Sequence, residues 1–288
     1  MRKLLLALPL LFLCACADDS LPNAQSGLVV EGFIENEGFP VVMVTRSLPV
    51  STDKRNLHNL DDYLVKWAKV SVVNREDTVI LTGMFDKGYL PPYIYTTGRM
   101  RGKVGETYKL IVEYDGMTAC ATTTITVPPQ VEGYTVEKCE GNDTLYQIKA
   151  RMKAEKDDAA YYQFFTRVGG DRKQFLASFL GNYSDSVVAG SYEMPVYRGH
   201  QSMTHDYTPY FLATDTVAVK CCRLDETEYN FWKTYTSSLH LSGAAMMSTT
   251  DNIPSNILGG SGYWFGYGST TSYFIISDSI HNKADRRN

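Results

Sequence analysis

The chain has 288 residues, and its 28 Lys and Arg stand against 32 Asp and Glu, which gives a formal net charge of −4. This acidic balance argues against a nucleic-acid-binding protein, which carries a strongly positive face. Hydrophobic residues make up 44% of the chain, so it can bury a core and is not disordered as a whole. The 20 Tyr and 12 Phe, with 22 Gly and 11 Pro between them, predict a mainly β protein.

The N-terminus has the features of a lipoprotein signal peptide. Arg2 and Lys3 precede an apolar run at 4–13, which is too short to cross a bilayer as a helix. The run ends in Leu13-Cys14-Ala15-Cys16, which resembles a bacterial lipobox. We expect cleavage after residue 15 and lipidation of Cys16, whose acyl chains would anchor the protein to a membrane. Cys14 is the poorer lipid acceptor because the bulky Leu13 precedes it. The alternative to a lipoprotein signal is an ordinary secretory signal peptide.

The mature N-terminus begins with an acidic pair. Asp18 and Asp19 lie directly behind the lipid anchor and resemble the surface-export signal of Bacteroidota lipoproteins. This predicts attachment to the outer membrane with the protein facing the cell exterior, through a tether over 16–27. The alternative is that the pair has no export role and is simply an acidic part of this solvated linker. Loss of Arg2 and Lys3 changes the formal charge from −4 to −6. An acidic protein is not attracted to anionic lipids, so the lipid itself must provide the anchor.

Residues 28–128 have the pattern of an immunoglobulin-like β-sandwich, with short strands at close spacing. The expected strands are 28–34, 41–46, 68–73, 78–82, 93–97, 109–114 and 117–127. Asp115-Gly116 suits the two-residue type I′ turn of a hairpin, because both residues tolerate positive φ. Pro128-Pro129 cannot donate ladder hydrogen bonds and stiffens the connection, so we expect a domain boundary there.

Residues 129–288 predict a second β-rich domain that contains one amphipathic helix. The expected strands are 134–138, 145–152, 161–168, 174–180, 216–223 and 273–277. The helix is expected near 225–241, where Asp225 and Glu228 form a capping-box pattern. One helix face collects apolar side chains at helical spacing, namely Tyr229, Trp232, Tyr235 and Leu239. We expect this face to pack on a sheet; the alternative is a docking face for a partner protein.

Motifs of catalysis and of metal binding are missing from the sequence. There is no His-Glu-x-x-His motif, no phosphate-binding Gly-rich loop and no Gly-x-Ser-x-Gly elbow. His200 and His205 are five residues apart, which fits neither a helix face nor a common zinc pair. The adjacent carboxylates Asp61-Asp62 and Asp157-Asp158 are expected to be solvated. We therefore assign no catalytic residue, metal or cofactor and expect a protein that is not an enzyme.

Four cysteines remain outside the signal peptide: Cys120, Cys139, Cys221 and Cys222. They are either buried free thiols or two disulfides, for which three connectivities are possible. If Cys221 and Cys222 lie on a strand, they point to opposite faces and cannot easily serve one site. Because no Cys-x-x-Cys is present, redox catalysis is not expected.

The segment 259–268 combines glycines with aromatic residues. Tyr263, Trp264, Phe265 and Tyr267 are the ligand-binding candidates, because their rings could stack on sugars or on peptide side chains. The alternative is a buried Gly-rich loop whose rings fill the core.

Six triplets consist of Asp, then Ser or Thr, then an apolar residue, and they resemble the O-glycosylation sequon of Bacteroidota exported proteins. The candidate acceptors are Thr78, Thr144, Ser186, Thr216 and Ser279, and Ser20 follows the same pattern. A turn Asp before a β-branched strand start gives the same pattern. Both interpretations place the Asp at an exposed strand entrance.

Three segments together resemble the family called domain of unknown function 4249. They are Leu28-Val-Val-Glu-Gly-Phe-Ile34 with 44–47, Val104-Gly105-Glu106-Thr107-Tyr108-Lys109-Leu110, and Ile253-Pro-Ser-Asn-Ile257 with the glycines that follow. Ser261 departs from the family, which usually has an apolar residue between those glycines. The resemblance implies an outer-membrane lipoprotein associated with a TonB-dependent receptor, and it brings no catalytic residues.

The function expected from these features is that of a non-catalytic binding subunit in a TonB-dependent nutrient uptake system, with an unknown nutrient as ligand and no nucleic acid. One alternative is a surface hydrolase of glycans or peptides, which would need a cleft with a perturbed carboxylate pair or a nucleophile. Another is an adhesin or structural surface protein, which would have long exposed loops and no pocket.

Overall fold

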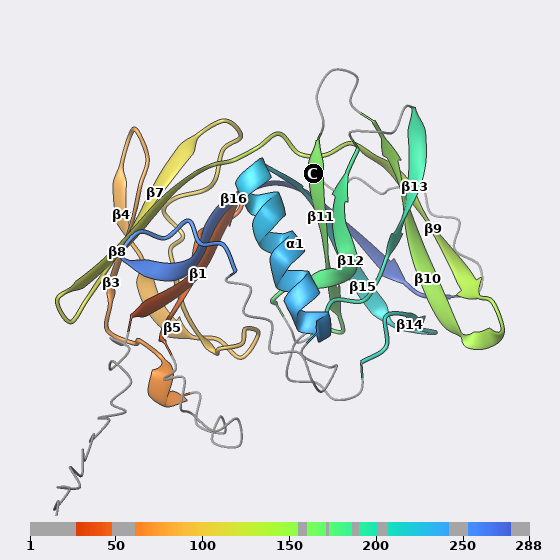
Figure 1. The fold of residues 1–288 in the computed structure, drawn as a ribbon, viewed down its shortest axis with the longest axis horizontal. Coiled ribbons are helices and arrows are strands. Elements are labelled where there is room, and N and C mark those ends of the chain that lie inside the picture. Colours follow the sequence, from red (N-terminus) through yellow and green to blue (C-terminus); the bar gives the residue numbers. More distant parts are fainter. Residues whose placement is uncertain are drawn as a thin grey trace, which may run out of the picture.

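The computed structural model describes residues 27–47, 61–154, 160–170, 173–185, 190–200, 207–241 and 253–277, with the side chains of 239–241 left aside (Figure 1). In this part of the chain the protein has sixteen strands and one helix, which confirms the mainly β class. Among the described helices we find none with the length and apolar character needed to cross a membrane. The signal peptide, Cys16, Asp18 and Asp19 lie outside the described residues.

Two sheets form the N-terminal sandwich at the left of Figure 1. The first contains, in spatial order, β1 (Leu28–Glu35), β2 (Val41–Arg46), β6 (Tyr93–Thr96) and β5 (Thr82–Phe85). The second contains β4 (Thr78–Ile80), β3 (Lys69–Val73), β7 (Thr107–Tyr114) and β8 (Met117–Thr124). These orders correspond to A-B-E-D and C′-C-F-G of an immunoglobulin-like sandwich, so the topology is consistent with the predicted class.

Alternation of apolar residues builds the core of this sandwich. Every second residue of β1 is buried, including Leu28, Val30 and Ile34, and they meet Leu110 and Val112 of β7. The predicted hairpin is present, because Tyr114 pairs with Met117 across a turn in which Asp115 and Gly116 have φ of 50° and 74°. Positive φ at both positions is the signature of the type I′ turn, which confirms that prediction.

The C-terminal strand β16 (Gly260–Ile275) belongs to both halves of the chain. Its first half pairs in parallel with β1, from Leu28 opposite Gly260 to Glu35 opposite Tyr267. Its second half pairs antiparallel with β15 (Thr216–Leu224), starting with Arg223 opposite Gly268. One sheet of eight strands therefore runs through the molecule in the order β12-β11-β15-β16-β1-β2-β6-β5. Pro128-Pro129 does not divide the chain into two sequential domains, because β16 completes the N-terminal sheet.

The C-terminal half adds a layer to each face of this long sheet. On one face the helix α1 (Glu226–Leu241) covers β11 (Tyr161–Val168), β12 (Leu176–Ser184) and β15, and it crosses the centre of Figure 1. The other face packs against a second sheet, in which β13 (Ser191–Val196), β10 (Asn142–Lys153) and β14 (Phe211–Leu212) are neighbours and β9 (Val131–Cys139) pairs with β10. Strands β13 and β14, together with β5, were not expected from the sequence.

Both faces of β15 are buried, which places the adjacent cysteines as predicted. Cys221 packs in the core between the two sheets, and Cys222 packs in the core under α1. Both are free thiols, as are the half-buried Cys120 and Cys139. Burial raises the pKa of the Cys221 and Cys222 thiols, so both are protonated at neutral pH.

The predicted capping box begins the helix. The Glu228 backbone N–H donates to Asp225 Oδ1 at 2.8 Å, and the Asp225 N–H donates to Glu228 Oε2 at 3.2 Å. The other oxygen of Glu228 accepts the Gly266 N–H at 3.2 Å, so the same side chain fixes α1 to β16. Phe231 and Trp232 are buried against the sheet, with Tyr229 and Tyr235 packed beside them. The prediction that this helix face packs on a sheet is confirmed; the Leu239 side chain lies outside the described residues.

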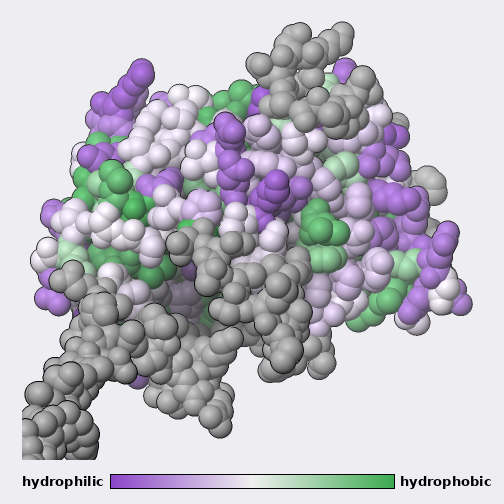
Figure 2. All heavy atoms as spheres, in the orientation of Figure 1, coloured by the Kyte–Doolittle hydropathy of each residue, from purple (hydrophilic) through white to green (hydrophobic). Residues whose placement is uncertain are grey.

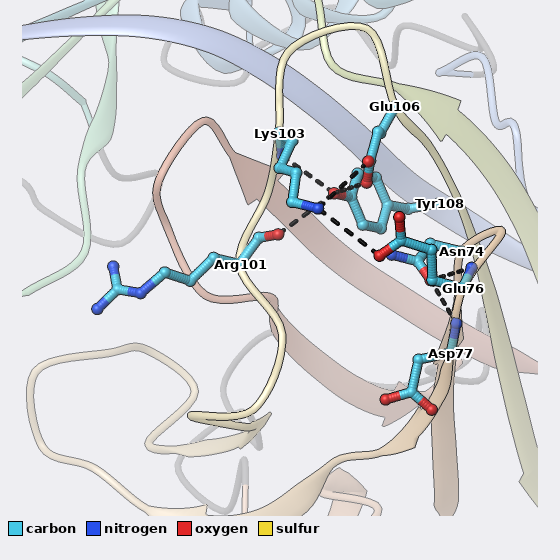
Figure 3. A network of polar contacts seen from close by, with 7 residues as sticks. All are labelled: Asn74, Glu76, Asp77, Arg101, Lys103, Glu106 and Tyr108. Atoms are coloured by element: carbon cyan, nitrogen blue, oxygen red, sulfur yellow. Dashed lines mark hydrogen bonds and ion pairs between the residues drawn. The ribbon is translucent and has the colours of Figure 1, made fainter.

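A buried tyrosine closes the end of the N-terminal sandwich (Figure 3). The Tyr108 hydroxyl accepts the Lys103 N–H at 3.0 Å and lies 2.9 Å from a Glu106 carboxylate oxygen and 3.2 Å from the Arg101 carbonyl. Lys103 Nζ reaches both Glu106 and Glu76, at 3.5 Å and 3.8 Å. This arrangement resembles the tyrosine corner of immunoglobulin-like sandwiches, in which a tyrosine at the start of strand F bonds back to the preceding backbone.

Large apolar side chains are also exposed at the edge of this sandwich. Figure 2 shows separate hydrophobic patches between hydrophilic residues on one face of the molecule. Trp67 is 88% exposed, and Ile80 and Phe85 on the edge strands β4 and β5 are also exposed. The segment that carries Trp67 is held against β6, because the Tyr93 hydroxyl donates to the carbonyl of Lys66 at 2.9 Å. We call Trp67, Ile80 and Phe85 the edge patch.

Replacing Tyr108 by Phe should destabilise the fold by about 1 kcal/mol, because the partly buried Lys103 N–H loses its acceptor while the ring stays. Chemical denaturation of wild type and variant measures this difference. Tyr273→Phe is the matched control: its side chain is exposed, so its effect should stay within about 0.5 kcal/mol. Equal stability of wild type and Tyr108→Phe would show that the corner makes no net contribution.

Candidate functional site

The segment expected to be an aromatic loop is the first half of β16, and three of its four candidate rings are buried. Trp264, Phe265 and Tyr267 are 0%, 1% and 4% exposed. Trp264 Nε1 donates to the Tyr108 carbonyl at 3.0 Å, inside the N-terminal core. Phe265 and Tyr267 pack under α1, where Tyr267 accepts a hydrogen bond from Trp232 Nε1 at 2.9 Å. These three rings fill the core, so a ligand surface formed by them is ruled out by their burial.

The glycines of this segment permit close approach of neighbouring backbone. A Cβ at Gly262, where φ is 108°, would collide with the Val30 carbonyl, and one at Gly268 would collide with the Thr126 carbonyl. Asn256 holds the same strand from outside: its side-chain amide donates to the Trp264 carbonyl at 2.8 Å and accepts the Trp264 N–H at 3.0 Å. Asn256 and Gly262 of the C-terminal motif therefore serve to position β16.

Tyr263, the fourth candidate, lines a cavity of about 480 Å³. Its walls come from β1 and β2, from the segments around 63, 90 and 175, from α1, and from the start of β16. This volume is in the range of small-molecule sites, which are usually concave and lined mostly by apolar groups. We take this cavity as the candidate functional site.

Six aromatic side chains contribute to the apolar wall. The rings that line the cavity are those of Tyr63, Phe175, Phe231, Trp232, Tyr235 and Tyr263. Phe231 stacks on Tyr235 with an interplanar angle of 9°, and its ring centroid lies 4.9 Å from that of Tyr263. Trp232 lies edge-on to Tyr263 at 5.5 Å. Because these rings hold one another, this wall is formed before any ligand binds.

Glu31 is the one carboxylate among the described residues of the cavity wall. It lies on β1 and faces away from the sandwich core, as do Val29 and Glu35. Burial raises the pKa of the Glu31 carboxyl, and no hydrogen bond or ion pair to it is found from the described residues. The partly buried carboxylate is therefore desolvated in part, without compensation from the part of the protein that the structure describes.

The two basic side chains of the wall do not neutralise Glu31. The Arg46 guanidinium donates to the Tyr114 hydroxyl at 2.9 Å and lies over the Tyr114 ring, which holds it away from Glu31. His200 is partly buried, and burial lowers its pKa, which favours the neutral imidazole at neutral pH. The cavity thus combines aromatic faces with a single carboxyl group that no described residue pairs.

Glu35, four residues after Glu31 on the same face of β1, is compensated. Lys220 of β15 forms an ion pair with Glu35, and Ser269 Oγ donates to the other carboxylate oxygen at 3.0 Å. The Lys220 ammonium lies 4.1 Å from the ring centroid of Phe175, which also lines the cavity. An ammonium held between a carboxylate and an aromatic face is therefore already built into this region of the protein.

The remaining predicted sites are distributed over the surface or lie outside the described residues. Thr78, Thr144 and Thr216 are exposed at or near strand starts. The expectation of an exposed Asp at a strand entrance is wrong for Asp185. This residue follows β12, is 4% exposed, and accepts the Ala160 N–H at 2.6 Å. Ser20, Ser186, Ser279, His205 and Asp157-Asp158 lie outside the described residues. Within the described part of the chain no three His, Cys, Asp or Glu come close enough to bind a metal.

Sequence reasoning missed Glu31 and Phe175 as site residues. Glu31 lies within the predicted strand at 28–34, where the alternation of side chains places it on the face that points away from the core. A carboxylate in an otherwise apolar strand was the one sequence signal that could have identified it. Phe175 precedes β12, and nothing local relates it to β1 or to α1. Phe231 was not counted in the predicted apolar face of the helix, yet it is buried beside Trp232.

Glu31→Gln should stabilise the protein at neutral pH. The pKa of Glu31 is higher in the folded state than in the unfolded state, where it is about 4.3. The free energy of unfolding therefore falls as pH rises from the unfolded pKa through the folded pKa. The amide of glutamine does not ionise, so the variant avoids this loss of stability. Denaturation at pH 7 should show this gain in stability. The gain should vanish in acid, where the Glu31 carboxyl of the wild type is protonated in both the folded and the unfolded state. Glu113→Gln is the control: it breaks an exposed ion pair with Lys69 and should cost less than about 1 kcal/mol. A Glu31→Gln protein less stable than wild type at pH 7 would contradict the desolvation of Glu31.

Comparison with known proteins supports one family assignment. The model of the family described as domain of unknown function (DUF4249) matches residues 18–273, which is most of the chain. No curated protein matches the sequence. The matched region includes β1, the Tyr108 corner and nearly all of β16, which are the three parts that carry the sequence resemblance. The chain therefore belongs to the DUF4249 family.

Proposed function

We propose that this protein is a lipid-anchored accessory subunit of a TonB-dependent nutrient uptake system at the bacterial outer membrane. In this proposal the cavity between β1, α1 and β16 binds the nutrient, and the protein does not catalyse a reaction. The preformed aromatic cavity carries the proposal, because its volume and lining suit a small ligand. The lipobox at Cys16 and the acidic pair Asp18-Asp19 support the location on the cell surface.

The edge patch supports contact with a partner protein. Trp67 is almost fully exposed, and Ile80 and Phe85 are exposed on the edge strands β4 and β5 of the same sandwich. Tryptophan is the residue type most enriched among binding hot spots. We propose the edge patch as the surface that contacts the receptor.

The lipid anchor predicts a difference between the two signal-peptide cysteines. Cys16→Ser should abolish incorporation of an alkyne-labelled fatty acid and should shift the protein away from the acylated membrane fraction, because the acceptor thiol is lost. Cys14→Ser is the matched control and should leave labelling unchanged. Labelling that survives Cys16→Ser but is lost in Cys14→Ser would move the anchor to Cys14.

The receptor association predicts the outcome of affinity purification from detergent-solubilised membranes. The tagged protein should bring down a β-barrel receptor of the TonB-dependent class, and Trp67→Ser should reduce its recovery about tenfold or more, as loss of a hot-spot side chain does. Ile275→Ser, which changes an equally apolar exposed residue on β16, should leave recovery intact. Isolation of the tagged protein alone from wild-type membranes would count against the association.

A further inference from the structure

We propose that the cavity binds a small organic cation, whose ammonium group pairs with the Glu31 carboxylate between the aromatic faces of Tyr235 and Tyr263. The inference rests on the proposed function, in which the cavity is the ligand site, and adds the chemical class of the ligand. It places the charged group of the ligand at β1 and its apolar body against the wall formed by α1 and β16.

The charge of the cavity selects the sign of the ligand. Glu31 faces the cavity without a cation from the described residues paired to it: Arg46, opposite Leu28 in the register, lies with Tyr114 on the other face of the sheet, and burial favours the neutral form of His200. A ligand anion would meet an uncompensated negative charge, and a neutral ligand would leave the carboxylate desolvated. A ligand cation compensates it, which turns a cost of the free protein into binding free energy.

The aromatic wall suits the same charge. Burial raises the pKa of both Tyr235 and Tyr263, and the negative charge of Glu31 raises it further, so the two rings lie within electrostatic reach of this carboxylate. The faces of aromatic rings attract ammonium groups, most strongly where water is excluded. Carboxylate and rings together form a cation site, whereas the rings alone would accept any apolar group.

The protein already shows this mode of recognition four residues further along β1. There the Lys220 ammonium pairs with Glu35, lies 4.1 Å from the Phe175 centroid, and lies 5.7 Å from that of Phe33. Glu31 and Glu35 share one face of β1, and Phe175 lines the cavity that Glu31 faces. For Glu31 no lysine of the described chain takes the equivalent place, so the ligand supplies the ammonium.

Three probes with the same aromatic body and different charge test the inference on the detergent-solubilised mature protein at pH 7. They are 2-phenylethylamine, 2-phenylethanol and phenylacetate, and their affinities are measured by titration calorimetry or ligand-observed NMR. The amine should bind about tenfold more tightly than the alcohol, and phenylacetate should bind most weakly. The affinity of the amine should fall as pH is lowered through the raised pKa of Glu31, because the protonated carboxyl cannot pair with it.

Variants separate the charge from the cavity. Glu31→Gln should weaken amine binding about 30-fold and leave the alcohol unchanged, whereas Glu193→Gln, an exposed glutamate of β13, should change neither. Ser261→Phe projects a ring into the cavity and should weaken all three probes. The pH dependence of amine binding must also be interpreted with the other charged and titratable groups of the described wall in mind, namely Arg46, His200, Tyr63, Tyr235 and Tyr263.

Each contrary outcome has a distinct meaning. If the alcohol or the acid binds as tightly as the amine, if the preference survives Glu31→Gln, or if the amine does not bind at millimolar concentration, the cation inference is overturned. If Ser261→Phe leaves the binding of every probe unchanged, the cavity is not the ligand site, and the binding function proposed for it fails as well.

Discussion

Strand β16 pairs with β1 along one half of its length and with β15 along the other, and the rest of the structure depends on this double pairing. The strand carries Trp264 into the core of the N-terminal sandwich and Phe274 into the core between the two sheets of the C-terminal half. Gly262 and Gly268 let it pass against neighbouring backbone where any side chain would collide. The two halves of the chain therefore share one sheet.

The candidate site is a consequence of this shared sheet. Its carboxylate comes from β1, its aromatic wall comes from α1 and β16, and Phe175 comes from the segment before β12. Glu228 fixes α1 to the backbone of Gly266, so the helix is held at the strand that also pairs with β1. A register slip of one residue in β16 would exchange its two faces and bury Tyr263 in place of Trp264. The geometry of the cavity is thus set by the same pairing that joins the halves.

What the sequence could predict was local. The Asp115-Gly116 hairpin and the Asp225–Glu228 capping box involve residues at most a few positions apart, and both are present. The part of β16 before Tyr273 was missed because its glycines carry the signal of a loop and its partners are distant in the sequence. Asn36 and Ser269, which form a hydrogen bond, are separated by 233 residues. The same separation hides the domain architecture and the meeting of Glu31 with α1. Tyr263 could be selected as aromatic, but only the pairing of β16 decides that it faces the cavity and Trp264 does not.

Glu31 and Glu35 show how one strand face can hold both a structural and a functional charge. Lys220 compensates Glu35 and in doing so ties β1 to β15 across the shared sheet. Glu31 lies nearer the start of β1, opposite the helix, and its desolvation has no such compensation from the described residues. A cation bound there would tie β1 to α1 in the way that Lys220 ties β1 to β15. Because such a ligand binds only the folded arrangement of both halves, its binding free energy would add directly to the stability of the junction. A bound ligand would then stabilise the junction between two parts of the protein. One is the N-terminal sandwich, which carries the edge patch, and the other is the half of the sheet that the helix covers.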